Sequence, residues 1–129
     1  GYFSFVAPYL KGEGLDLACG SGIFTALAAR AGHKMTGIDS SPEMLNAAEG
    51  RCSAEWVLAD ISRIKIPENT YGFVTCVCDG FNYLSPRALA RTVNNIYAAL
   101  DGGGVLVFDV STPYKLKSVG NKAFFYDDG

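Results

Sequence analysis

The residues with the clearest chemical potential form a glycine-rich turn after a short apolar run. Residues 15–22 read Leu-Asp-Leu-Ala-Cys-Gly-Ser-Gly, and an amphipathic stretch follows them. Glycine lets the backbone approach a ligand without a Cβ clash, and the free N–H groups at a helix start favour hydrogen-bond acceptors. The turn therefore suits a nucleotide-like cofactor, although a tight strand-to-helix turn also needs glycine for steric reasons alone.

Two aspartates stand at matching places further along the chain. Asp39 follows the run at 36–38, and Asp60 follows the run at 57–59. If both runs are parallel strands, their carboxyl ends meet at one crevice of the sheet. There Asp39 can accept hydrogen bonds from two ribose hydroxyls and Asp60 from an exocyclic adenine amine. Each aspartate alone is better explained as a turn or N-cap residue, but together with the glycine turn they predict a cofactor site.

Short apolar runs alternate with longer amphipathic stretches along the chain, which is typical of strands joined by crossover helices. Gly32 suits the left-handed position that ends a helix, and Ser41 with Pro42 marks a helix start. This order predicts an α/β fold with a Rossmann-like, doubly wound, mostly parallel sheet. Helices are predicted at residues 2–10, 23–31, 42–50 and 85–100, and strands at 15–18, 34–38, 54–58, 73–78 and 105–110.

Composition excludes several classes of function. Hydrophobic residues make up 49% of the 129 residues, and 11 Lys+Arg against 13 Asp+Glu are scattered along the chain. The hydrophobic content suffices for the core of one compact domain. The scattered charges form no basic stripe that could bind nucleic acid. No apolar stretch approaches the roughly 20 residues that span a bilayer, so we expect a cytoplasmic protein without a membrane partner. Four cysteines and one histidine lack the spacing of a metal site, so we expect reduced thiols and no metal.

Three motifs taken together are recognisable. LDLACGSG, GIDSSPEML and LADI, at these separations, closely resemble the class I S-adenosylmethionine-dependent methyltransferases, from the first helix to Val110. The segments CDGFNYL and FDVSTPYKL further resemble a small-molecule subgroup in which D-x-x-N-Y follows the fourth strand. The resemblance implies the strand order 3-2-1-4-5 and a C-terminal antiparallel hairpin that is missing from this chain.

Carried over by position, the resemblance implies a site for S-adenosylmethionine, with S-adenosylhomocysteine as the product. The methionine portion is expected against Asp16 and the loop that begins at Ala18, where many members have glycine. The ribose is expected against Asp39, and the adenine against Asp60 and the Ile61 backbone. The expected cofactor-binding residues are Asp16, Ala18, Cys19, Gly20, Gly22, Asp39, Ser40, Met44, Asp60, Ile61 and Cys78.

The resemblance also indicates where methyl transfer takes place. Cys78 and Asp79 are expected beside the methionine amine and the reactive methyl. The candidate catalytic residues on the acceptor side are Asp79, Asn82 and Tyr83. A sulfonium already makes its methyl electrophilic, so the main task is to align a nitrogen or oxygen nucleophile of a small molecule for in-line displacement. Asp79 can attract an amine or accept its proton, whereas Asn82 and Tyr83 are equally explained as capping the turn before Pro86.

Two other functions and one structural choice stay open. A non-catalytic module could keep the cofactor pocket for regulation or assembly. A nicotinamide-dependent oxidoreductase is disfavoured, because its G-x-G-x-x-G fingerprint would need glycine where Thr25 stands. The aromatic first helix either covers the cofactor, as the resemblance implies, or packs on the sheet.

The resemblance predicts an exposed strand edge as well. Residues 1–129 are expected to form a methyltransferase core that is incomplete at both ends, so the strand at 105–110 would be an apolar edge facing water. We expect residues 114–126 to fold back over this edge, or a second chain or further residues to cover it. Self-association through this edge is one expected outcome.

Overall fold

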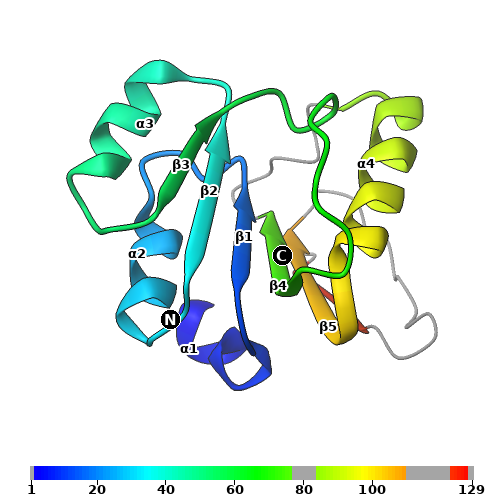
Figure 1. Cartoon of the computed structure of the whole chain (residues 1–129), viewed down its shortest axis with the longest axis horizontal. Helices are drawn as coiled ribbons and strands as arrows, with labels where there is room; N and C mark the ends of the chain where they lie inside the picture. The colour runs from blue at the N-terminus through cyan, green and yellow to red at the C-terminus, as the bar shows by residue number, and fades with distance from the viewer. Residues whose placement is uncertain (1, 77–83, 110–122, 128–129) are drawn as a thin grey trace.

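The structure, a computed structural model, describes residues 2–76, 84–109 and 123–127 (Figure 1). Within these residues, six parallel strands form one sheet in the order β3-β2-β1-β4-β5-β6. The α/β class, the parallel doubly wound sheet and the order 3-2-1-4-5 are thereby confirmed. The strands are β1 Gly14–Leu17, β2 Met35–Asp39, β3 Glu55–Leu58, β4 Tyr71–Cys76, β5 Leu100–Asp109 and β6 Ala123–Asp127.

Helices cover both faces of the sheet. Figure 1 shows α2 and α3 on one side of the strands and α4 on the other. Serine caps fix two of the helix starts, as the sequence predicts: Met44 N donates to Ser41 Oγ at 3.3 Å, and Ala88 N donates to Ser85 Oγ at 3.1 Å. The helices that cover the sheet are α2 Ile23–Arg30, α3 Pro42–Glu49 and α4 Pro86–Ala99; the two with serine caps are α3 and α4.

The first helix is shorter than the sequence predicts. Pro8 has no N–H to donate, and its ring clashes with the preceding helical turn, so the α-helix stops before it. Val6 and Leu10 are buried in a cluster with Phe24 of α2, which places this segment against the body of the fold. Packing on the sheet is therefore the role that the structure shows for it. The segment divides into α1 Tyr2–Val6 and the 3-10 helix η1 Ala7–Tyr9.

Two hydrophobic clusters follow from the alternation of strand side chains between opposite faces. On β1, Leu15 and Leu17 point toward α4, while Asp16 points toward α2. The cluster on the α4 side includes Ile38, Val74, Cys76, Ile96, Ala99, Leu106 and Phe108. The cluster on the α2 side includes Val6, Leu10, Phe24, Ala28, Met35, Phe73, Val105 and Val107.

Strand β5 begins earlier than the sequence predicts. Leu100 pairs with Tyr71 of β4, whereas Phe73, two residues further along β4, pairs with Val105, so the Asp-Gly-Gly-Gly segment of β5 between them bulges out. Gly103, with a φ of 84°, supplies a left-handed residue within this bulge. Residues 101–104, which lie between the predicted helix at 85–100 and the predicted strand at 105–110, are therefore an interruption inside a longer strand.

The outer side of β5 is paired by the chain itself. Residues 123–127 form β6, which runs parallel to β5 from the pair Val105–Ala123 to the pair Asp109–Asp127. The described end of the 114–126 segment thus lies against the edge, as expected, and self-association stays a prediction. Every strand pair in the described ranges is parallel, so the antiparallel hairpin is not among them. Those ranges also hold no helix long and apolar enough to cross a bilayer, and no cluster suited to a metal ion.

Candidate cofactor-binding site

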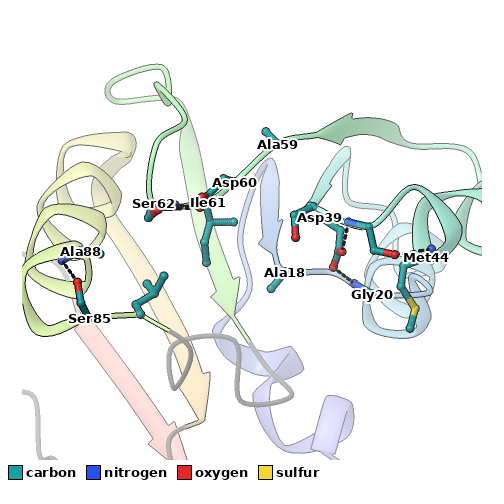
Figure 2. Close-up of a pocket in the computed structure, with 13 residues that line it drawn as sticks. Ala18, Gly20, Asp39, Met44, Ala59, Asp60, Ile61, Ser62, Ser85 and Ala88 are labelled. Atoms are coloured by element: carbon teal, nitrogen blue, oxygen red, sulfur yellow. Dashed lines mark hydrogen bonds between the residues drawn. The ribbon is translucent and has the colours of Figure 1, made fainter.

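A pocket of about 640 Å³ lies at the carboxyl ends of β1, β2 and β3, which is a usual size for a small-molecule site. Figure 2 shows Asp39 and Gly20 on one side, Ser85 and Ala88 at the start of α4 on the opposite side, and Ile61 between them. The strand ends and one helix start therefore face a shared space. The lining residues are Ala18, Gly20, Asp39, Ser40, Ser41, Met44, Ala59, Asp60, Ile61, Ser62, Leu84, Ser85 and Ala88.

The loop between β1 and α2 turns by means of left-handed residues. The φ angles are 53° at Ala18, 59° at Gly20 and 82° at Gly22. Glycine adopts this conformation freely, whereas an alanine there costs roughly 1–2 kcal/mol. A positive φ at Ala18 gives a physical reason why glycine is common at this place in the resembling family. The loop is anchored to the next strand because Cys19 N donates to the Ile38 carbonyl at 2.9 Å.

Asp39 joins the end of β2 to this loop. Its Oδ2 accepts a hydrogen bond from Gly20 N at 2.8 Å, and its Oδ1 accepts one from Ser41 N at 2.9 Å. The carboxylate therefore sets both the loop and the turn before α3. Each oxygen has a further lone-pair direction, so Asp39 can still accept hydrogen bonds from a ligand.

Asp60 stands at a turn after β3 and is 53% exposed at its side chain. Its Oδ1 accepts from Ser62 Oγ at 2.7 Å and from Ser62 N at 2.9 Å, while Arg63 Nε lies 3.8 Å from Oδ2. The Ser62 hydroxyl and backbone bonds, followed by the Arg63 charge, hold the pKa of this carboxyl below its usual value. Asp60 is thus an ionised turn residue that also lines the pocket.

Asp16 lies beneath the loop rather than in the pocket. The side chain is fully buried, and its Oδ2 and Oδ1 accept from the hydroxyls of Thr25 at 2.6 Å and Thr75 at 2.8 Å. Burial raises the pKa of this carboxyl to about 6, and this effect outweighs the two hydroxyl hydrogen bonds, which lower the pKa. Burial likewise raises the pKa of the neighbouring Cys19 thiol to about 12. That thiol stays neutral at physiological pH and is a poor nucleophile.

The wall formed by α4 contains site residues that sequence reasoning missed. Arg91 Nε of α4 donates to the Ser62 carbonyl at 3.0 Å, which ties this helix to the turn after β3. The only local signal for this wall is the Ser85-Pro86 helix start, whose position in space depends on the whole crossover. The lining residues not expected from the sequence are Ser41, Ala59, Ser62, Leu84, Ser85 and Ala88.

Most of the expected cofactor-binding residues meet in this pocket, and none of the residues of α1 lines it. Those that line it are Ala18, Gly20, Asp39, Ser40, Met44, Asp60 and Ile61. Those in the described ranges that do not line it are Asp16, Cys19 and Gly22, which belong to the strand end and loop beneath. Cys78 falls outside the described residues, and so do the candidate catalytic residues Asp79, Asn82 and Tyr83.

Comparison with known proteins places this chain in a family. Residues 15–104 match the methyltransferase domain family, and the chain belongs to it. A candidate methyltransferase of Geobacillus sp. (strain WCH70) is 33% identical over 134 residues, covering 95% of this chain and 54% of the relative. The chain spans about half the length of the curated relatives it matches.

Solved structures with the same fold give a consistent result. An S-adenosylmethionine-dependent methyltransferase from Clostridium acetobutylicum superposes with a TM-score of 0.73 at 27% identity, over 83% of this chain and 46% of its own. The sugar N-methyltransferase KedS8 from Streptoalloteichus sp. superposes with a TM-score of 0.70 at 28% identity, over 84% of this chain and 44% of its own.

Proposed function

We propose that the chain is the cofactor-binding part of an enzyme that transfers a methyl group from S-adenosylmethionine to a nitrogen or oxygen of a small molecule. The observation that carries the proposal is the pocket in which the glycine loop, Asp39 and Asp60 meet. Membership of the methyltransferase domain family supports the reaction. The names of the Clostridium structure and of KedS8 support the cofactor and the class of acceptor.

The residues of the pocket fit the adenosyl group. Asp39 keeps free lone pairs on both oxygens, which suit two ribose hydroxyls. Ionised Asp60 can accept from an adenine amine through Oδ2, and the Ile61 side chain offers an apolar wall for the ring. The Asp39 carboxylate disfavours the 2′-phosphate of NADP, whereas it suits the ribose of NAD as well as that of S-adenosylmethionine.

Thr25 also argues against a dinucleotide site. A dinucleotide fingerprint has glycine at this position for close packing of the helix on the strand. Here the Thr25 hydroxyl is buried and donates to Asp16, so the position holds a side chain with a structural hydrogen bond. We therefore favour S-adenosylmethionine over a nicotinamide cofactor.

The roles of the described residues follow from their places. When bound, the cofactor supplies an electrophilic methyl group. The loop at 18–22 and Asp39 bind and orient the cofactor, and the buried Asp16 supports the loop from below. We propose that Asp79, Asn82 and Tyr83 line the acceptor side, where Asp79 attracts an amine or accepts its proton. We propose that Cys78 lies beside the methionine amine of the cofactor. The cytoplasmic location of the protein stays a prediction.

Calorimetric titration of the full-length protein tests the proposed cofactor. S-adenosylhomocysteine should bind, and NAD should bind more weakly or not at all. Asp39→Ala should weaken S-adenosylhomocysteine binding by roughly 1–3 kcal/mol, because the ribose hydroxyls lose a charged acceptor. Asp101→Ala, at the opposite end of the sheet, is the matched control and should leave binding unchanged. Tighter binding of NAD, or an unchanged dissociation constant in Asp39→Ala, would contradict the proposal.

Transfer of a labelled methyl group tests the proposed reaction. The full-length protein would be given labelled S-adenosylmethionine and a panel of small amines, phenols and carboxylates. Label should appear in one class of acceptor, and its chemical form would show whether nitrogen or oxygen is methylated. Tight cofactor binding without transfer to any acceptor would instead favour a non-catalytic binding module.

A further inference from the structure

One row of residues crosses the sheet directly beneath the glycine loop. The strand register pairs Thr75 with Asp16, Asp16 with Gly37, and Gly37 with Trp56. Residues in register on parallel strands point to the same face of a sheet. Because Asp16 bonds to Thr25 of α2, this face is the one that α2 covers. Trp56 therefore shares the face on which the loop and α2 rest.

The Trp56 indole occupies the space that a side chain at Gly37 would need. A Cβ on Gly37 would lie 2.5 Å from Trp56 Cζ3 and 2.7 Å from Cε3, closer than real contacts allow. The same ring reaches the loop, since a Cβ on Gly22 would lie 3.0 Å from Trp56 Cη2 and 2.9 Å from Ala48 Cβ. The ring is thus wedged between β2, the loop and α3.

Backbone hydrogen bonds and packing together support this end of the loop: Gly22 N donates to the Cys19 carbonyl at 3.1 Å, and the Gly22 carbonyl accepts from Ala26 N at 2.9 Å. The positions before Gly22 are also tied to residues outside the loop, since Cys19 N and Gly20 N each donate to β2 and Arg51 Nε donates to the Ser21 carbonyl at 2.8 Å. Gly22 caps α2 in a left-handed conformation and has no side chain to pack. Without the indole, two residues that lack side chains would border a void.

We infer that Trp56 is a positioning residue for the cofactor loop, because its indole fixes Gly22 and thereby the start of α2. The inference rests on the proposed cofactor site. Trp56 does not line the pocket, so it acts through the loop and makes no direct contact with the ligand. Binding groups need support to within about 0.5 Å, and a displacement of about 1 Å can cost up to roughly 100-fold.

The first test removes the ring and then restores part of it. In full-length protein, Trp56→Leu should raise the dissociation constant of S-adenosylhomocysteine roughly 10-fold, whereas Trp56→Phe, which keeps an aromatic ring, should stay within about 3-fold. Ile96→Val, a change in the buried cluster on the α4 side, is the control for general loss of stability. It should lower the unfolding temperature without changing the dissociation constant.

A second test uses the glycine that makes room for the ring. Gly37→Ala should weaken binding in the wild-type background, because the new methyl group displaces the indole. In the Trp56→Leu background the two closest contacts of the methyl group are removed and Cys19 Sγ, at 3.1 Å, is the one that is left, so Gly37→Ala should have a clearly smaller effect. This non-additivity is measured by a double-mutant cycle on the dissociation constants. Equal effects in both backgrounds would overturn the inference.

Hydrogen exchange separates a local role from a global one. Amides of residues 18–24 should exchange faster in Trp56→Leu, while peptides from α4 stay as in the wild type. If Trp56→Leu binds as tightly as wild type while Asp39→Ala loses affinity, the inference about Trp56 fails and the proposed site stands. If wild type does not bind S-adenosylhomocysteine, or Asp39→Ala binds as well as wild type, the proposed site fails and the inference falls with it.

Discussion

Replacing Asp16 with asparagine should remove a loss of stability that the wild-type protein suffers as pH rises. Burial raises the pKa of Asp16 from its ordinary value of 3.8 to about 6 in the folded protein. The folded state therefore holds the proton more tightly than the unfolded chain. The associated stability is fully present below the unfolded pKa and is lost as pH rises through about 6. The gap between the two pKa values corresponds to about 3 kcal/mol.

Urea unfolding of wild type and Asp16→Asn at a series of pH values measures this effect. Groups other than Asp16 titrate alike in both proteins, so the difference between their free energies of unfolding isolates Asp16. Relative to wild type, the variant should gain about 3 kcal/mol between pH values of about 4 and 8, because asparagine has no proton to lose. The amide can still pair with the hydroxyls of Thr25 and Thr75, so the fold should be kept.

A constant difference across this pH range would refute the reasoning. It would mean that the hydroxyl bonds from Thr25 and Thr75 outweigh burial, so that Asp16 stays ionised in the folded protein. Thr75→Val sharpens the test, because it removes one of these donors and should raise the pKa of Asp16 further. Stability in that variant should then continue to fall to a higher pH than in wild type.

Three further predictions use the loop, a close backbone approach and the turn after β3. Ala18→Gly relieves a left-handed alanine and should stabilise the protein by up to about 1 kcal/mol in urea unfolding; a clear loss would show that the alanine is not strained. Gly72→Ala places a Cβ 1.8 Å from the Lys11 carbonyl oxygen and should cost about 3 kcal/mol or more, measured as a fall in the thermal midpoint. Ser62→Ala removes a hydroxyl donor and should raise the pKa of Asp60 in a carboxyl NMR titration; an unchanged pKa would show that the backbone bond suffices.

The local signals in the sequence predicted most of the fold. Ser41 and Ser85 begin their helices as expected, because capping depends on residues a few positions away. The start of β5 could not be predicted, since Leu100 joins the strand only by pairing with Tyr71, far away in the chain. Pro8 was a visible signal for the early end of α1, but the apolar pattern continues past it.

The site was predictable where it consists of strand ends. Asp39 and Asp60 line the pocket because a parallel sheet brings the carboxyl ends of its strands together. Its far wall was not predictable, because Leu84 and Ala88 reach the pocket only through the placement of α4. The burial of Asp16 was not predictable for a similar reason, because its hydrogen-bond partner Thr75 is 59 residues away in the chain.

The wedged indole has a practical consequence. Trp56 is the only tryptophan in the chain, and its ring touches the loop whose state matters most. Selective excitation of tryptophan in this domain therefore reports on that contact without any attached dye. Stopped-flow fluorescence can follow how fast the loop responds to a ligand, whereas a calorimetric titration measures only the equilibrium. Trp56→Phe provides a matched dark protein for subtracting the background, so the domain carries its own optical probe of its binding loop.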